Sequence, residues 1–384
     1  MDKEILLRSS WQDVNIGDIS HTPAMLAILE KQLPEVKVTV WASSYITNNV
    51  IDMIQKRFQG VGFIKGNADN ADVREAIMRA DFLLHGSGPF LVGAHEIKQY
   101  IELTGKKFGA SGITYRRADK EMLNKSEFVY FRDSVSLENA KNDGVKAKYL
   151  DFGPDAAFAF DLEAENKAEK FLSDNKLEYK KFVCCIPRLR ITPYWKMRSD
   201  APYNRESDEI NNRFKEQDHK YLRAAIIRVL ENTDVKVLVC PEDQTQMLVG
   251  KEMIIDKLPK KYHEKVVLRS DYWLTDEAVS VYRKSLALFG NEMHSPIMCI
   301  GNNIPAVVCR WEQQTSKGFM WNDIGLGEWL FDSDVGINDD DFADTIMDVV
   351  INNDKAVNKT KQALDIVNRN FVNMASRIRS ALNM

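Results

Sequence analysis

Short hydrophobic runs alternate with amphipathic stretches along the chain, a rhythm typical of parallel β-sheets whose strands are joined by helices. In the first half, the predicted strands are Ile5–Arg8, Lys37–Trp41, Gly62–Lys65, Phe82–His85, Lys107–Ala110, Phe128–Phe131 and Lys148–Leu150. In the second half they are Phe182–Ile186, Val235–Val239, Val266–Leu268, Leu286–Phe289 and Ala306–Cys309. The pattern therefore predicts an α/β protein with two parallel sheets.

Helix signals lie between these runs. Thr22 followed by Pro23 predicts a helix start, because threonine caps helices and proline suits the first turn. A second helix is predicted from Ser134 to about Asp143, ending at Gly144, where a left-handed residue closes helices.

The charged segment 161–178 predicts a connecting helix between two halves. We therefore divide the chain near residue 175, into Rossmann-like domains of residues 1–175 and 176–384. The second domain closes with one or two amphipathic helices after Asp354.

Composition narrows the class of protein. With 44% hydrophobic and 28% charged residues the chain is typical of packed domains, and its formal charge of −4 argues against a nucleic-acid coat. No hydrophobic run approaches the roughly 18 residues of a membrane helix, and the N-terminus lacks a secretory signal. The five cysteines form no CxxC pair, which predicts buried reduced thiols in a cytoplasmic protein without a transmembrane segment.

Two loops of the first half follow predicted strands, where α/β proteins bind ligands. One places Asn15 and Asp18 before a helix, a start that favours anions or sugar hydroxyls, although an Asx turn fits equally well. The other carries two glycines that allow a close ligand or a sharp turn: Gly86, Ser87 and Gly88. No Lys-Ser or Lys-Thr follows, so a nucleoside triphosphate site is not predicted.

The most informative loop of the second half begins at Pro187. Arg188 and Arg190 lie just past a strand, where a guanidinium can bind phosphate or carboxylate. Pairing of these arginines with acidic neighbours on a surface loop fits equally well. Tyr194 and Trp195 in the same loop suit stacking on a sugar ring.

A second candidate loop covers residues 290–296, which predict a strand end, a tight polar loop and a short helix with proline near its start. His294 and Ser295 would both face a ligand there. Arg310 and Lys317 follow the next strand and add charge to the same end of the sheet. No cluster has the spacing of a metal site, a Gly-x-Ser-x-Gly elbow is absent, and no cofactor is predicted.

An ordered series of segments resembles the polysaccharide pyruvyl transferase family across nearly the whole chain. The segments are Asn15-Ile16-Gly17-Asp18, Ala80-Asp81 with Gly86-Ser87-Gly88, Arg132-Asp133-Ser134-x-Ser136, Asp155-Ala156-Ala157-Phe158, and Met293-His294-Ser295 with Ile304-Pro305-Ala306. Each segment is weak alone, and their order and spacing make the match specific.

The resemblance implies a fold like that of GT-B glycosyltransferases, with two Rossmann-like domains facing a central cleft. It implies transfer of a pyruvyl group from phosphoenolpyruvate to sugar hydroxyls, on a glycan or lipid-linked sugar of exopolysaccharide biosynthesis. The N-terminal domain would then bind the acceptor and the C-terminal domain the donor. His294 and Glu292 would be catalytic, and the sequence leaves monomer or homo-oligomer open.

One position departs from the family, whose usual motif is Arg-Leu-His where this chain has Glu292-Met293-His294. At ~4 Å and an effective dielectric of ~20, each unit charge pair is worth about 4 kcal/mol, so replacing arginine by glutamate disfavours a phosphate strongly. We expect Glu292 to pair with a neighbouring arginine or to accept hydrogen bonds from ligand hydroxyls. A glycosyltransferase with a nucleotide-sugar donor and a non-catalytic glycan-binding relative therefore stay open as alternatives.

Overall fold

The computed structural model describes residues 3–9 and 11–384, so Ser10 of the first predicted loop lies outside it. The chain forms two compact units. Unit 1 comprises residues 1–13, 17–162 and 365–384, and unit 2 comprises residues 14–16 and 163–364. The sequence-based boundary near residue 175 lies at the end of α7 (Glu165–Asp174), and the assignment of acceptor and donor to the two domains stays a prediction.

Within the described residues, unit 1 contains a seven-stranded parallel sheet of order β3-β2-β1-β4-β5-β6-β7. Its strands are β1 (Glu4–Arg8), β2 (Lys37–Ala42), β3 (Gly62–Lys65), β4 (Phe82–His85), β5 (Phe108–Ile113), β6 (Phe128–Phe131) and β7 (Leu150–Phe152). Its helices are α1 (Ile16–Gln32), α2 (Asn48–Arg57), α3 (Ala71–Arg79), α4 (Ala94–Thr104), α5 (Lys120–Leu123) and α6 (Ser134–Asn142). The order reverses direction between β1 and β4, which opens a crevice for strand-end loops.

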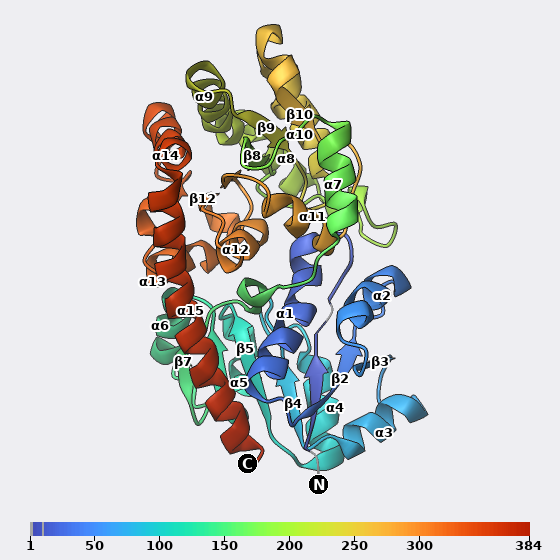
Figure 1. The fold of residues 1–384 in the computed structure, drawn as a ribbon. Coiled ribbons are helices and arrows are strands. Elements are labelled where there is room, and N and C mark those ends of the chain that lie inside the picture. The colour runs from blue at the N-terminus through green and yellow to red at the C-terminus, as the bar shows by residue number, and fades with distance from the viewer. Residues whose placement is uncertain (1–2, 10) are drawn as a thin grey trace. The chain divides into compact units, whose positions relative to one another are not determined.

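The described part of unit 2 contains a six-stranded parallel sheet of order β10-β9-β8-β11-β12-β13. Its strands are β8 (Phe182–Ile186), β9 (Lys236–Val239), β10 (Val266–Leu268), β11 (Leu288–Gly290), β12 (Ala306–Arg310) and β13 (Leu330–Asp332). After α7 come α8 (Arg205–Phe214), α9 (Gln217–Asn232), α10 (Gln246–Met253), α11 (Thr275–Tyr282), α12 (His294–Gly301), α13 (Met320–Asp323) and α14 (Asp339–Ile351). The last helix, α15 (Asn353–Ala381), begins in unit 2 and ends in unit 1 (Figure 1).

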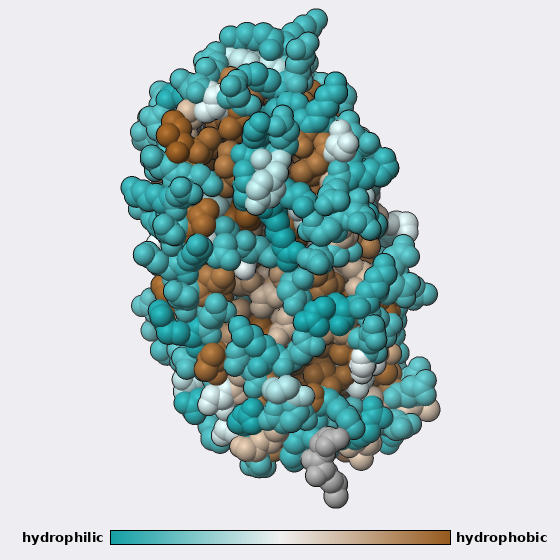
Figure 2. Space-filling view, in the orientation of Figure 1, coloured by the Kyte–Doolittle hydropathy of each residue, from teal (hydrophilic) through white to brown (hydrophobic). Residues whose placement is uncertain are grey.

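Each unit has its own hydrophobic core. In unit 2, Phe342 of α14 contacts Tyr221, Phe289 and Phe331 edge-on, with ring centroids 5.3, 6.2 and 5.0 Å away. Such aromatic contacts add stability beyond the area they bury. Outside the cores, hydrophilic residues cover most of the face in Figure 2, with hydrophobic residues in small separate patches. None of the helices among the described residues is long and apolar enough to cross a membrane.

The structure confirms most of the element predictions and corrects two. Every predicted strand overlaps an observed one, α6 is followed by Gly144 at φ +71°, and all five cysteines, each in the described part, are buried thiols. The pattern does not predict β13, because three residues are too few for a periodicity to show. The predicted helix start at Thr22 is wrong, because α1 begins at Ile16, whose amide donates to the Glu242 carbonyl at 2.9 Å. That tertiary contact is invisible in the sequence.

Candidate functional site

The strand order of unit 2 brings three loops together. β8 lies between β9 and β11, and the order reverses between β8 and β11, so the loops after these strands share one edge of the sheet. Gly290 at the end of β11 permits the close approach, because a Cβ there would lie 2.3 Å from the Ile186 carbonyl oxygen. In parallel α/β sheets, ligands bind outside such a switch point.

Three buried carboxyl groups meet at this edge, and we call them the carboxyl cluster: Glu242, Asp243 and Glu292. Each is at most 1% exposed. Gln246 of α10 connects them, because its amide nitrogen donates to Glu292 Oε1 at 2.6 Å and to Asp243 Oδ2 at 3.2 Å. The amide oxygen of the same side chain accepts from the Glu242 backbone N–H at 2.7 Å.

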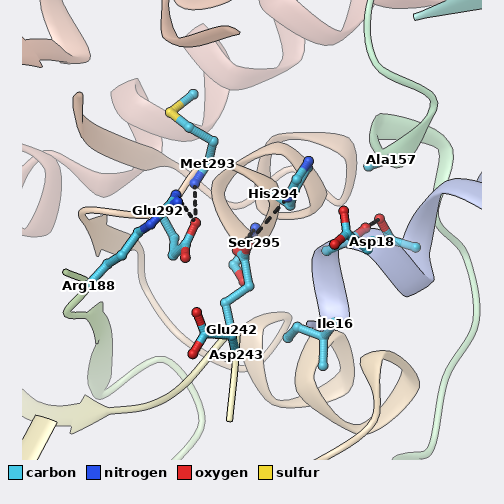
Figure 3. A network of polar contacts seen from close by, with 12 residues as sticks. Ile16, Asp18, Ala157, Arg188, Glu242, Asp243, Glu292, Met293, His294 and Ser295 are labelled. Carbon is cyan, nitrogen blue, oxygen red and sulfur yellow. Dashed lines mark hydrogen bonds and ion pairs between the residues drawn. The ribbon is translucent and has the colours of Figure 1, made fainter. Parts of the chain in front are cut away.

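Arg188 provides a positive charge to the cluster. Its Nη1 donates to Glu292 Oε2 at 3.0 Å, and the Met293 backbone N–H donates to the same oxygen at 3.3 Å (Figure 3). Burial alone would lower the pKa of Arg188, but the carboxylates of Glu292, Asp243 and Glu242 raise it above its ordinary value. Glu292 thus pairs with a neighbouring arginine, one of the two partners expected from the sequence.

The cluster holds a proton near neutral pH. Burial, reinforced by the Glu242 carboxylate and only partly offset by Arg188, raises the pKa of Glu292 to about 7. Burial and the charge of Glu292 raise the pKa of Asp243 to about 6. Carboxyls that are buried close together cannot all ionise cheaply, so one of them keeps its proton and becomes an acid.

His294 lies at the start of α12, beside Glu242. Its Nδ1 is 3.3 Å from Glu242 Oε1, and the backbone N–H of Ser295 donates to Glu242 Oε2 at 2.6 Å (Figure 3). The Ser295 hydroxyl accepts from Tyr282 at 3.3 Å. The helix start that the sequence predicts at this loop is confirmed, and its carboxylate comes from the loop after β9.

Asn15, which is predicted to bind the acceptor, is joined to this region of unit 2. It forms an antiparallel bridge with Asp243, and the Gln244 N–H donates to the Val14 carbonyl at 3.2 Å. Residues 14–16 therefore fix the backbone of the loop that carries Glu242 and Asp243.

Arg190 and Arg310 have other carboxylate partners. Arg190 is 3% exposed and donates to Asp218 at 2.8 and 3.0 Å and to Asp334 at 2.6 Å. Arg310 pairs with Asp332 and donates to the Thr315 carbonyl. Because carboxylates hold these two guanidiniums, they offer less charge to a donor than Arg188, whose partner Glu292 has a pKa raised to about 7. Lys317 is buried, and its charge lowers the pKa of Glu292.

The aromatic residues Tyr194 and Trp195 lie on the loop that carries Arg188. Tyr194 is 37% exposed, and Trp195 meets Tyr203 edge-on with 5.5 Å between ring centroids. Partly exposed rings of this kind suit stacking against a sugar, and their role in acceptor binding stays a prediction.

The remaining candidates belong to the strand-end loops of unit 1. Asp18 accepts from the Gln12 side chain in the first turn of α1. Ser87 is fully buried, its hydroxyl accepts from the Ala156 N–H at 2.9 Å, and its carbonyl accepts from the Trp11 indole at 2.7 Å. A Cβ on Gly86 would lie 3.0 Å from the Ser9 hydroxyl. The glycine loop is therefore held by its own protein contacts.

Sequence reasoning missed Glu242, Asp243 and Gln246. A signal was present, because Glu242 and Asp243 follow the predicted strand Val235–Val239 after only two residues. Loops after parallel strands bind ligands, and this loop also follows a predicted strand. The segment Cys240-Pro241-Glu242-Asp243 resembles no catalytic motif. Only the strand order shows that it lies beside the loops that carry Arg188 and His294.

Comparisons with known proteins identify the family and the fold of the chain. The model of the family described as polysaccharide pyruvyl transferase matches residues 15–313, which include the carboxyl cluster, Arg188 and His294. No curated protein matches the chain significantly.

Solved structures share the fold at low sequence identity. S. aureus MnaA, solved with UDP, is 12% identical with a TM-score of 0.61, over 99% of this chain and 97% of that one. Anabaena HepE, solved with UDP and glucose, is 9% identical with a TM-score of 0.60, over 99% of both chains. The E. coli ADP-heptose lipopolysaccharide heptosyltransferase II is 11% identical with a TM-score of 0.52, over 92% and 99%. The chain thus has the GT-B-like fold that the sequence predicts.

Proposed function

Since the chain belongs to the polysaccharide pyruvyl transferase family, we propose that it transfers a pyruvyl group from phosphoenolpyruvate to hydroxyls of a glycan or glycan precursor. The family match across the loops of the site carries the proposal. The enol methylene takes one proton, a sugar hydroxyl attacks the adjacent carbon, and phosphate leaves with a second proton. A second hydroxyl then closes the ketal, and the two hydroxyl protons restore the acids.

Two residues suit the two proton transfers. Glu292 has a pKa of about 7, so a large fraction of the molecules carry a proton on Glu292 at neutral pH. This proton can be transferred to the methylene carbon. His294, at the start of α12, suits donation to the leaving phosphate, because an imidazole exchanges protons near neutral pH and helix starts favour anions.

Protonation of Glu292 also changes what Arg188 can bind. In the ionised state, Glu292 occupies the guanidinium and opposes an anionic donor. Once Glu292 is neutral, Arg188 can hold the phosphate or carboxylate of phosphoenolpyruvate, with the charge of Lys317 nearby. The proposal thus accounts for glutamate in the place of the family's arginine. A phosphoenolpyruvate donor would place the reaction in the cytoplasm, as a step of exopolysaccharide synthesis.

The alternative is a glycosyltransferase with a nucleotide-sugar donor. Buried carboxylates are good acceptors for sugar hydroxyls, and Glu292 replaces a phosphate-binding residue. MnaA and HepE, which share the fold, were solved with UDP. A glycan-binding relative without activity would keep the aromatic loop and lose the need for His294.

Ligand-induced stabilisation separates these functions. A ligand at 100 times its Kd stabilises the folded protein by about 2.7 kcal/mol, which shifts the melting temperature measurably. Phosphoenolpyruvate, a set of nucleotide sugars and oligosaccharides would each be tested at pH 6.5. We expect a shift with phosphoenolpyruvate that Arg188→Ala strongly reduces, whereas Arg205→Ala, a change at an 84% exposed arginine, preserves it. A shift with a nucleotide sugar alone, or with oligosaccharide alone, would replace the proposal by the matching alternative.

Variants of Glu292 test the charge argument. Glu292→Gln removes the negative charge and keeps an acceptor for Arg188, so phosphoenolpyruvate should bind at least tenfold more tightly while turnover falls. Glu292→Arg restores the family's residue and should also improve binding. Calorimetry that finds equal donor affinity in wild type and Glu292→Gln would contradict the argument.

A further inference from the structure

Glu242 lies where a carboxylate can control the state of His294. We propose that Glu242 is a positioning residue that holds His294 with its proton on Nδ1, so that Nε2 is the nitrogen that exchanges protons with a ligand. An ionised carboxylate only accepts hydrogen bonds, so the 3.3 Å contact between Oε1 and Nδ1 requires the hydrogen on Nδ1. The tautomer is a property of the fold, and only its catalytic consequence rests on the proposed function.

Both the carboxylate and the backbone of Glu242 are held by neighbouring residues. Its second oxygen accepts from the Ser295 backbone N–H at 2.6 Å, at the positive end of α12. The backbone N–H of Glu242 donates to the side-chain oxygen of Gln246 at 2.7 Å, and its backbone carbonyl accepts from the Ile16 N–H at 2.9 Å. Glu242 is fully buried, so water does not compete for either oxygen. A side chain fixed in this way fixes the imidazole that it contacts.

Among the three carboxyls of the cluster, Glu242 is the one that contacts His294. Glu292 and Asp243 are the members of the cluster whose pKa burial raises, and Arg188 and Lys317 act on Glu292. The backbone N–H of Ser295, which donates to Glu242 at 2.6 Å at the start of α12, suits a carboxylate acceptor. The carboxyls whose pKa burial raises are therefore the neighbours of Glu242, and Glu242 itself faces the histidine.

The substitution Glu242→Gln should reverse the tautomer. The glutamine oxygen would accept from Ser295, which leaves the NH2 group to donate to Nδ1 and moves the histidine proton to Nε2. The analogous change in the serine-protease triad costs about 10⁴-fold in turnover through the wrong tautomer. We expect kcat to fall by about 10²- to 10⁴-fold with KM changed only a few-fold. Glu242→Asp, which keeps a carboxylate, should recover part of the lost turnover.

The test is nitrogen NMR of the full chain labelled at its six histidines, with His294→Asn to identify the signal. At pH 8, His294 of the wild type should be protonated on Nδ1 and unprotonated on Nε2, and Glu242→Gln should show the reverse. A proton on Nε2 in the wild type would overturn the proposal even if the variant failed to fold. So would an unchanged tautomer in a folded Glu242→Gln protein. The expected tautomers without pyruvyl transfer would contradict the proposed function and leave the positioning role intact.

Discussion

The two sheets have the same reversal of strand order, yet their carboxyl edges differ in chemistry. In unit 1, Arg132 and Asp155 form a fully buried pair at 3.0 Å, and Arg132 also donates to Thr114. Burial, with the charge of Arg8, lowers the pKa of His85 to about 3, so this histidine is neutral and accepts from the Gly93 N–H. In unit 2, three carboxyls share one arginine and a histidine.

The difference lies in the balance of buried charges. At the edge of unit 1, Arg132 meets the carboxylate of Asp155 and His85 stays neutral, and both arrangements stabilise the fold. At the edge of unit 2, the acids outnumber their cations, and burial raises two pKa values toward neutrality. Strongly perturbed groups of this kind are enriched at functional sites. The perturbed carboxyls therefore support the proposal that the proton transfers take place in unit 2.

The largest effect is expected on turnover, when a histidine of unit 2 rather than one of unit 1 is replaced. His294→Asn keeps a hydrogen-bonding side chain but loses proton transfer, so turnover should fall by about two to four powers of ten while the protein folds. His85→Asn, at the corresponding edge of unit 1, should lower the melting temperature and leave turnover per folded molecule within a few-fold. Initial rates and calorimetric scans of both variants provide the measurement. Unchanged turnover in His294→Asn would leave a binding protein.

Two arginines sharpen the comparison. Arg132→Ala leaves Asp155 buried without its guanidinium, and the loss of one partner of a buried ion pair costs about 3 to 5 kcal/mol of unfolding free energy. Arg188→Ala should instead raise the KM for the donor by about 10- to 100-fold, the worth of one charged hydrogen bond. Urea unfolding and donor titrations would separate the two effects. An Arg188→Ala variant that is destabilised with an unchanged KM would place Arg188 with the structural arginines.

Stability should depend on pH through the carboxyl cluster. Glu292 has a pKa raised from 4.5 to about 7, so its neutral form is favoured by folding, and stability falls as pH rises from about 4.5 through 7. The loss is on the order of 3 kcal/mol, at about 1.4 kcal/mol for each pKa unit. Urea unfolding at pH 5 and pH 8 should show a smaller decline for Glu292→Gln than for the wild type. The same decline in both proteins would mean that Glu292 is already ionised in the folded protein.

The smallest effect concerns the aromatic loop. Trp195→Ala removes a ring that suits sugar stacking, which is worth about 0.5 to 1.5 kcal/mol, so the acceptor KM should rise about two- to tenfold. Donor binding should not change. Tyr179→Ala, at a 67% exposed tyrosine of unit 2, is the matched control. Equal acceptor KM values in the two variants would remove Trp195 from the acceptor site.

The sequence predicts the fold well because each buried parallel strand is a short hydrophobic run that stands out between polar loops. It also selects Arg188 and His294, which lie in the loops after two such runs, and their roles stay predictions. It cannot show that Arg190 is held by Asp218, or that Asn15 joins the loop of Asp243, because these partners lie far apart in the chain. Perturbed pKa values are equally hidden, since they arise from burial and from neighbours that folding assembles.

Product analysis tests the central claim most directly. Phosphoenolpyruvate labelled with ¹³C at its second carbon would be incubated with the protein and oligosaccharides that carry free hydroxyl pairs, and followed by carbon and phosphorus NMR. The account predicts that the enol signal gives way to a ketal carbon on the sugar while an equal amount of phosphate appears, and that His294→Asn abolishes both changes. Phosphoenolpyruvate that stays intact while a nucleotide sugar is consumed with the same acceptors would contradict it.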